Sequence, residues 1–238
     1  MTDATAIAAP GDTRKAGRLV YITSVAVLCA WVLVPLYFLL INTLSSPEAV
    51  NAYPKSFVPE FDLGSLTFFA NFEGMLNALK NSILVAGLTM VMSITIGAPA
   101  GYALSRFDFR GKELFRLLIL LTRAFPLPLL ALPLAFMLIM SGIEDTIFGL
   151  ALVHSTLAIP FAVLITFSLF SGIPIELEEA AWTLGCNRLT AFTKVVFPLI
   201  LPGITASAIF AFVISWNEVF AAAVLTIENR TLTAFLLQ

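Results

Sequence analysis

Long stretches without charged residues are the feature that most limits what this sequence can fold into. Three stretches contain no Asp, Glu, Lys or Arg: 19–47, 81–105 and 146–175. Two more contain a single charge each, Arg123 within 117–143 and Glu218 within 195–227. A helix needs roughly 20 apolar residues to cross the hydrocarbon core of a bilayer, and each stretch is long enough. The sequence therefore predicts a protein that crosses a membrane several times.

These stretches predict an all-α membrane protein with five transmembrane helices. The expected helices lie near 19–42, 80–104, 115–141, 148–171 and 199–226. The composition agrees, because 59% of the residues are hydrophobic and 12% are charged, about half the charged share of a typical soluble domain. The first stretch is too long for a signal peptide and lacks a small-residue cleavage pattern, so we expect it to remain as a helix.

Basic residues are distributed unevenly over the segments that connect the expected helices. One set of segments carries Arg14, Lys15, Arg18, Arg106, Arg110, Lys112, Arg116, Arg188 and Lys194. The alternate segments are mostly acidic. Lys and Arg concentrate on the cytoplasmic side of membrane proteins. We therefore expect a cytoplasmic tail at 1–18 and a transmembrane domain at 19–238, with an external segment at 43–79 and a cytoplasmic loop at 171–198.

The expected loop 171–198 has the pattern of two short helices joined by a turn. Pro174 suits a first helical turn, and the acidic residues that follow lie where the helix dipole favours negative charge. Gly185 is expected to end the first helix, as Gly does just past a helix C-terminus. Asn187 can cap the second helix.

Leu177, Ala180, Ala181 and Leu184 form one apolar stripe on the first of these helices. The pattern alone leaves two interpretations open. The segment either covers the ends of the membrane helices or docks on a partner. The central alanines favour docking, because Ala lets another backbone approach closely, and the neighbouring glutamates suit a groove that carries Arg or Lys.

The segment EEAAWTLGCNRLTAFTKVVFPLILPGI resembles the EAA loop of permeases from binding-protein-dependent ABC importers. That pattern is Glu-Ala-Ala, three residues, Gly, nine residues, then hydrophobic-x-hydrophobic-Pro. It is matched by Glu179, Ala180, Ala181, Gly185, Val195, Phe197 and Pro198. The segments SWNEVFAAAVLT and RAFPLPLLALPL are similar to the carbohydrate branch, the maltose-permease-like second subunit. The similarity extends from about residue 15 to residue 238.

The resemblance implies a six-helix importer permease fold, with a sixth helix after residue 238. It implies a transport subunit, not an enzyme, in the inner membrane of a bacterial cell. The subunit would translocate a sugar or polyol. Its partners would be a second permease in a heterodimer, two ATPase subunits, a periplasmic or tethered solute-binding protein and membrane lipid. ATP and Mg would bind to the ATPase, and this chain would hold no cofactor. The residues implied in ATPase coupling are Glu178, Glu179, Ala180, Ala181 and Gly185.

Polar residues inside the expected spans are candidates for a substrate pathway. A charge at a helix centre costs about 2.5–3.5 kcal/mol on insertion scales, so the presence of Arg123 and Glu218 inside the spans requires a structural or functional explanation. Arg123 suits either snorkelling or an ion pair between subunits, or else a role in a pathway or gate, in a span interrupted by prolines. Trp216, Asn217 and Glu218 combine an aromatic face with polar groups, which suits either sugar binding or anchoring at the interface. His154 is expected to make a helix–helix hydrogen bond.

Other functional classes find little support in the sequence. No Gly-x-x-x-x-Gly-Lys-Ser/Thr pattern is present, so the chain lacks a P-loop for ATP hydrolysis. No nucleophile–base pair, metal-ligand set or nucleic-acid motif is evident. Two alternatives remain: an ABC permease for a different solute, such as an oligopeptide or phosphonate, and an ion-coupled secondary transporter acting through Arg123 and Glu218. The second class is typically built from internal repeats, and none is recognisable here.

Overall fold

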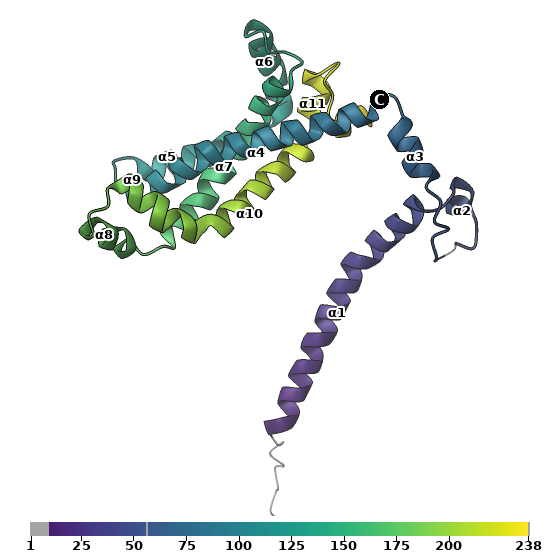
Figure 1. Cartoon of the computed structure of the whole chain (residues 1–238), viewed down its shortest axis with the longest axis horizontal. Helices are drawn as coiled ribbons and strands as arrows, with labels where there is room; N and C mark the ends of the chain where they lie inside the picture. The colour runs from purple at the N-terminus through teal and green to yellow at the C-terminus, as the bar shows by residue number, and fades with distance from the viewer. Residues whose placement is uncertain (1–9, 56, 238) are drawn as a thin grey trace, which may run out of the picture. The chain divides into compact units, whose positions relative to one another are not determined.

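The computed structural model describes residues 10–55 and 57–237, and every regular element in those ranges is a helix (Figure 1). The chain divides into two compact units, Met1–Phe72 and Glu73–Gln238, so the boundary lies inside the expected external segment 43–79. Residues 1–9 of the expected tail 1–18 lie outside the described residues. Helix α1 begins at Pro10, within that tail.

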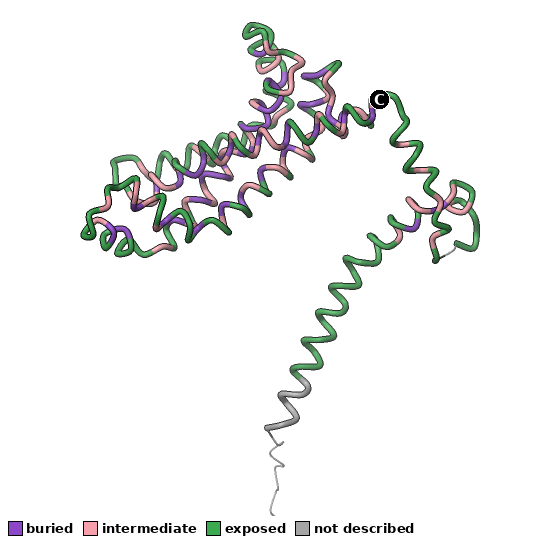
Figure 2. Tube along the Cα trace, viewed as in Figure 1, coloured by how far each residue is buried: buried purple, intermediate pink, exposed green. Residues whose placement is uncertain are grey.

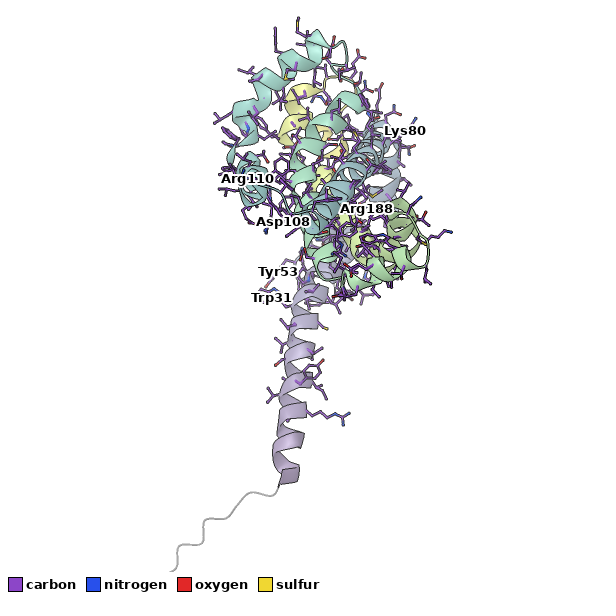
Figure 3. All side chains as sticks on the ribbon, turned by 90° about the vertical axis from the view of Figure 1, so that its left-hand side faces the viewer. Trp31, Tyr53, Lys80, Asp108, Arg110 and Arg188 are labelled. Atoms are coloured by element: carbon purple, nitrogen blue, oxygen red, sulfur yellow. The ribbon has the colours of Figure 1, made fainter. Side chains whose placement is uncertain are left out.

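The first unit is dominated by helix α1, Pro10–Thr43, followed by α2, Pro47–Asn51, and α3, Gly64–Asn71. Between Gly17 and Ile41, in the part of α1 whose burial the structure describes, almost nothing is buried within the unit, as Figure 2 shows. Trp31 is 80% exposed and projects from the helix (Figure 3). A helix that is apolar on all sides needs lipid or other helices around it. This agrees with the expected first span at 19–42.

Three long helices form the body of the second unit: α4, Met75–Arg106; α7, Ile147–Ser171; and α10, Phe197–Trp216 (Figure 1). Each packs against the other two. Small residues make this packing possible, because no large side chain separates the backbones. The buried small residues of α4 recur mostly every three or four positions: Ala78, Ser82, Ala86, Thr89, Ser93, Gly97 and Gly101.

Helices α4 and α7 approach most closely beside Gly97 and Gly101. A Cβ atom added at Gly97 would lie 2.6 Å from the Cβ of Ala162 on α7. The hydroxyl of Thr166 on α7 donates to the Gly97 carbonyl oxygen at 3.0 Å across the interface. Close contact and interhelical hydrogen bonding are the main sources of helix association in lipid, where burial from water contributes little.

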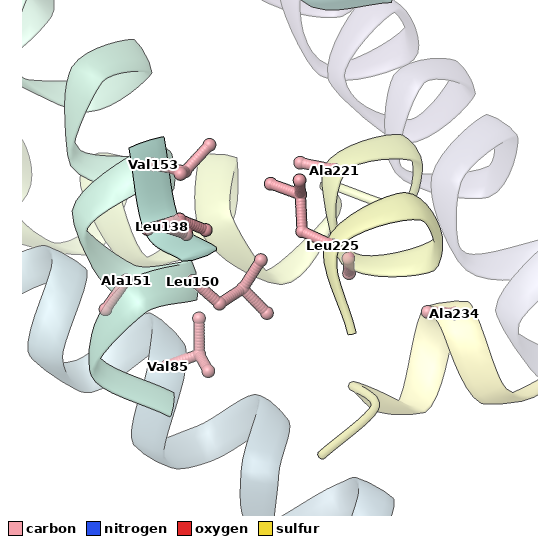
Figure 4. Close-up of a cluster of buried hydrophobic side chains, with 9 residues drawn as sticks. Val85, Leu138, Leu150, Ala151, Val153, Ala221, Leu225 and Ala234 are labelled. Carbon is pink, nitrogen blue, oxygen red and sulfur yellow. The ribbon is translucent and has the colours of Figure 1, made fainter. Parts of the chain in front are cut away.

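A hydrophobic cluster closes one end of the second unit (Figure 4). It joins α4 and α7 to three shorter helices: α6, Leu127–Met140; α11, Phe220–Leu225; and α12, Leu232–Phe235. Its buried residues are Val85, Leu138, Leu150, Ala151, Val153, Ala221, Ala222, Leu225 and Ala234. The opposite end carries α8, Glu176–Thr183, and α9, Arg188–Ala191 (Figure 1).

The expected third span at 115–141 is not one helix. Helix α5, Lys112–Leu121, runs into a 3₁₀ turn at Thr122–Ala124, and the direction then changes by 92° before α6. Phe125 and Pro126 are extended at the bend. Proline pushes the residue before it out of the helical region, which accounts for the break. Residues 10–55 and 57–237 thus contain four continuous helices long enough to cross a membrane, or five candidates if the bent pair is one span.

The expected fifth span at 199–226 also has different limits. Its helical run begins earlier, with α9 and a π-helical turn at Phe192–Val196 leading directly into α10. It ends at Trp216, and residues 220–225 form the separate helix α11. Hydrophobicity predicted the apolar segment correctly, but it carries no information about a break within it.

Asp145, which follows α6, ties its own segment to the segment that follows α11. Its carboxylate accepts backbone N–H bonds from Ile227 and Asn229 at 3.0 and 3.1 Å and from Glu228 at 2.9 Å. Burial alone would raise the pKa of Asp145. The three N–H donors and the nearby Arg230 outweigh it and hold the pKa below its usual value.

Asp145→Asn should lower stability near neutral pH by about 1–3 kcal/mol, since the replacement amide turns a donor toward the Glu228 N–H. The depressed pKa means that the stabilisation is complete above the ordinary Asp value near 3.9 and is lost as the pH falls through the folded-state pKa. Thermal unfolding in detergent at a series of pH values is the measurement. The difference in unfolding temperature between wild type and variant should disappear at acidic pH. A difference that does not depend on pH would contradict this account.

Candidate functional site

The segment 171–198 folds as two short helices joined by a tight turn, as its pattern predicts. Helix α8 carries Glu176, Glu178 and Glu179 in its first turn, where the N-terminal end of the helix dipole stabilises negative charge. The side chain of Asn187 accepts the Thr190 N–H at 2.8 Å and so caps α9. Both ends of the turn are therefore set by local sequence.

Gly185 ends α8 in the left-handed conformation, with φ of +88°. Its N–H donates to the Trp182 carbonyl oxygen at 2.9 Å, and the Cys186 N–H donates to that of Ala181 at 3.0 Å. This pair of bonds is the Schellman motif, which satisfies the last carbonyl groups of a helix. A Cβ atom at Gly185 would meet nothing within 4 Å, so the backbone angle, not space, requires glycine.

Glu178 points into the second unit, and its side chain is 1% exposed. One carboxylate oxygen lies 2.5 Å from Nε of Arg106, the last residue of α4. The other oxygen accepts the Tyr102 hydroxyl at 2.6 Å. Nη2 of Arg106 also donates to the Ile173 carbonyl oxygen at 3.1 Å. Glu178 thus makes its contacts within the chain, and its role in ATPase coupling stays a prediction.

The expected apolar stripe of α8 does not lie against the rest of the unit. Only Ala181 of the four residues is buried, whereas Ala180 is exposed and Leu184 is 86% exposed. Leu189 on α9 is 72% exposed, and Glu179 is exposed beside Ala180. The outer surface of α8 and α9 therefore combines large apolar side chains with an acidic one.

A hollow of about 300 Å³ opens between the end of α4 and the turn after α8. Asp108 and Arg188, both labelled in Figure 3, line it together with Trp182. The guanidinium of Arg188 lies 5.0 Å from the centre of the Trp182 ring, a favourable position over an aromatic face. The basic and acidic groups balance, so the hollow has no pronounced charge.

Glu218 is held inside the second unit at the start of α11. Its carboxylate accepts the N–H groups of Phe220, Ala221 and Ala222 at 3.1, 2.8 and 3.3 Å. Nε2 of His154 on α7 lies 3.4 Å away, without hydrogen-bond geometry. Nδ1 of His154 lies 2.8 Å from the Ser215 hydroxyl on α10, which confirms the expected helix–helix hydrogen bond.

The other candidate pathway residues are engaged separately. The Trp216 ring stacks on Phe212 with centres 5.8 Å apart, and the exposed Asn217 donates to the Val213 carbonyl oxygen of its own helix. Arg123 is exposed in the single chain, and its guanidinium lies over the Phe161 ring of α7. The structure does not gather these side chains around Glu218. Their role in a substrate pathway stays a prediction.

A family model decides the class of protein. The model is described as the binding-protein-dependent transport system inner membrane component, and it matches residues 93–238. The chain belongs to this family. It is accordingly a permease-type membrane component of an ABC transporter and not an enzyme, and it contains the EAA loop that the resemblance indicated.

Several curated relatives of this permease are named for sugar transport. It is 36% identical over 176 residues to the trehalose transport system permease protein SugB of Mycobacterium tuberculosis, covering 71% of this chain and 64% of that protein. It is 31% identical over 199 residues to the diacetylchitobiose uptake system permease protein NgcG of Streptomyces coelicolor, covering 81% and 65%. The permease thus spans about two thirds of the length of these relatives.

A solved structure supports the fold of the permease. A bacterial ABC transporter involved in the import of the acidic polysaccharide alginate aligns with a TM-score of 0.74 over 98% of this chain and 82% of that one. The identity is 23%, so the match establishes the fold alone. The all-helical importer permease fold expected from the sequence is confirmed.

Sequence reasoning missed the inner contacts of the permease. Arg106 was counted only as one of several basic residues, and Tyr102 and Ser215 were not singled out. A weak signal existed for Tyr102 and Arg106, which lie four residues apart at the end of a span and so share one helix face. Their partner Glu178 lies more than 70 positions away, a pairing that periodicity does not reveal.

Proposed function

We propose that this chain is the transmembrane permease subunit of an ATP-driven ABC importer for a sugar or polyol. The loop 171–198 would lie in the cytoplasm and couple the permease to a separate ATPase, which binds ATP and Mg. A periplasmic or tethered solute-binding protein would deliver the solute. A second, similar permease would complete the membrane pathway, in contact with lipid.

One observation supports the coupling role: the outer surface of the loop is apolar and is not covered by any of the residues that the structure describes. Leu184 and Leu189 are 86% and 72% exposed on a segment between two spans. Exposed apolar patches beside polar groups are typical of protein interaction sites. Glu179 and Ala180 lie on the exposed side of α8, so a partner groove can approach the backbone at Ala180 and offer a basic side chain to Glu179.

The sugar assignment is supported by what the relatives are named for. Trehalose and diacetylchitobiose are the solutes in the names of the two relatives described above, and sulfoquinovosyl glycerol is the solute in the name of a third relative. All are rich in hydroxyl groups. A non-carbohydrate solute remains the alternative within the same importer class.

Reconstitution tests the proposal. The chain, its companion permease, the ATPase and the solute-binding protein would be assembled in proteoliposomes and offered labelled disaccharides, polyols and a control peptide. Uptake should require ATP and the binding protein and should persist after ionophores collapse ion gradients. Uptake that follows the gradient without ATP would instead support a secondary transporter. Uptake of peptide alone would overturn the sugar assignment.

Cysteine labelling tests the orientation of the loop. In a Cys29→Ser background, the partly exposed Cys186 should resist a membrane-impermeant maleimide in intact cells and react after permeabilisation. The expectation follows from the excess of Lys and Arg on this side. The control is a cysteine introduced at Glu144, at the opposite end of the unit, which should react in intact cells. Labelling of Cys186 from outside would reverse the proposed topology.

A further inference from the structure

We propose that Arg106, Tyr102 and Glu178 form a positioning link through which movement of α8 is transmitted to α4. The inference rests on the proposed function, because it assigns α8 two faces with separate tasks. The outer face binds the ATPase. The inner face holds the end of α4.

The three side chains use both oxygens of one carboxylate. Nε of Arg106 donates to Oε1 of Glu178 at 2.5 Å, and the Tyr102 hydroxyl donates to Oε2 at 2.6 Å. Arg106 also reaches the Ile173 carbonyl oxygen, in the segment that leads from α7 into α8. Hydrogen bonds to charged groups are short and directional. They fix the distance and the orientation of α8 relative to the last turn of α4.

Helix α8 also packs against the π-helical turn and α9, which follow it in the chain. Its buried residues are Glu178 and Ala181 alone among its eight described residues. Ala181 contributes one methyl group, which resists sliding poorly. Glu178 therefore supplies the polar attachment of α8 to α4, and a displacement of α8 relative to α4 must either move Arg106 or break the ion pair.

The link is anchored in an aromatic cluster that reaches the other long helices. The Tyr102 ring lies 5.2 Å from Phe170 near the end of α7 and 4.7 Å from Phe192, where the π-helical turn before α10 begins. Edge-on contacts at these distances are favourable and hold a ring in one orientation. Tyr102 therefore connects the carboxylate of α8 to all three long helices of the second unit.

An ion pair suits transmission better than apolar packing would. A buried ion pair adds little net stability compared with hydrophobic residues of the same shape. Losing one partner is nevertheless strongly destabilising, because the other charge is left buried and unpaired. Arg106 and Glu178 are 9% and 1% exposed. Apolar side chains at these positions could slide past one another, whereas the charged groups must move together.

The test compares assembly with coupling in the complete reconstituted importer. Variants Glu178→Gln, Arg106→Lys and Tyr102→Phe each weaken the link with little change in volume. The matched control is Glu113→Gln, which removes the same charge from the exposed Glu113–Arg116 pair, 2.9 Å long and on the neighbouring helix α5. The readouts are ATPase recovered with the complex and solute transported per ATP hydrolysed.

We expect Glu178→Gln and Arg106→Lys to lower the transported solute per ATP at least fivefold, with ATPase recovery within twofold of wild type. Tyr102→Phe should lower the ratio less. The double variant Tyr102→Phe/Glu178→Gln should be no worse than Glu178→Gln alone. Both changes act on the same bond, between the Tyr102 hydroxyl and the side chain at position 178, so their effects should not add. The control should keep the wild-type ratio.

Two results would overturn the link. The first is a wild-type ratio in Glu178→Gln and Arg106→Lys. The second is a loss of recovered ATPase with a normal ratio in the complex that remains, which would make the contact purely structural. These outcomes differ from failure of the proposed function, in which the wild-type complex itself shows no ATP-dependent uptake and the transmission role falls with it.

Discussion

Gly101→Ala should destabilise the second unit by about 2 kcal/mol, although Ala is the better helix former. The intrinsic preference would favour Ala by about 1 kcal/mol. The added Cβ atom, however, would lie 2.6 Å from the Phe167 backbone nitrogen and 2.9 Å from the Val163 carbonyl oxygen. Backbone atoms cannot rotate away, so α4 and α7 must separate, and overpacking of this kind costs about 1–3 kcal/mol before the bonds of Thr166 are weakened.

The matched control lies on the same helix. A Cβ atom at Gly87 would meet nothing within 4 Å, so Gly87→Ala should leave stability unchanged or raise it by up to about 1 kcal/mol. Thermal unfolding in detergent measures both, and the expected difference is several degrees, since about 1 kcal/mol moves the midpoint of a protein this size by roughly 2–4 °C. Equal midpoints for the two variants would show that α4 and α7 are farther apart than the structure has them.

The membrane helices could be predicted from sequence because lipid strongly disfavours charged side chains all along a span. The stretches 19–47, 81–105 and 146–175 contain no charged residue, and the apolar parts of helices α1, α4 and α7 lie there. The absence of charge does not predict where a helix bends or ends. The bend after Ala124 occurs inside an apolar segment, where hydrophobicity does not change, and the end of α10 at Trp216 is marked only by the polar residues Asn217 and Glu218. Pro126 gave a local sign of the bend but not its angle.

The local parts of the candidate site could also be predicted. Gly185 and Asn187 act through bonds to residues a few positions away, so their roles can be inferred from the segment itself. Glu178 and Glu218 differ in this respect. Neighbouring glutamates in one helical turn look alike in sequence, and only the position of α4 determines that Glu178 is buried while Glu179 is exposed.

The same tertiary context explains why Glu218 lies where it does. A glutamate near the end of an apolar span suggested a polar surface toward a pathway. In the structure its carboxylate satisfies the first N–H groups of α11 and lies near His154. Three residues separate the end of α10 from the start of α11. The first backbone N–H groups of a helix have no partner within it, and here the Glu218 carboxylate accepts them. Predicting this required knowledge of the break before α11.

Glu179→Lys should reduce recovery of the ATPase with the complex at least tenfold while leaving membrane insertion intact. Glu179 is exposed, and its side chain makes no hydrogen bond or ion pair within the described residues, so its substitution breaks no side-chain contact within the chain. A charge-assisted bond to a partner contributes about 1.5–3 kcal/mol, and reversal adds repulsion from the basic groove we propose. About 1.4 kcal/mol corresponds to a tenfold change in affinity, so a tenfold loss is the lower end of the expected range.

Co-purification at matched permease levels measures this loss, with Glu144→Lys as the control that makes the same charge change at the other end of the unit. The comparison with Glu178→Gln is the sharper one, because the two residues are adjacent in sequence. Glu179→Lys should lose the ATPase, whereas Glu178→Gln should keep it and lose transported solute per ATP. Opposite defects at adjacent positions are expected only if α8 has one face for the ATPase and another for α4. If Glu179→Lys retains full recovery, the outer face of α8 is not the docking surface.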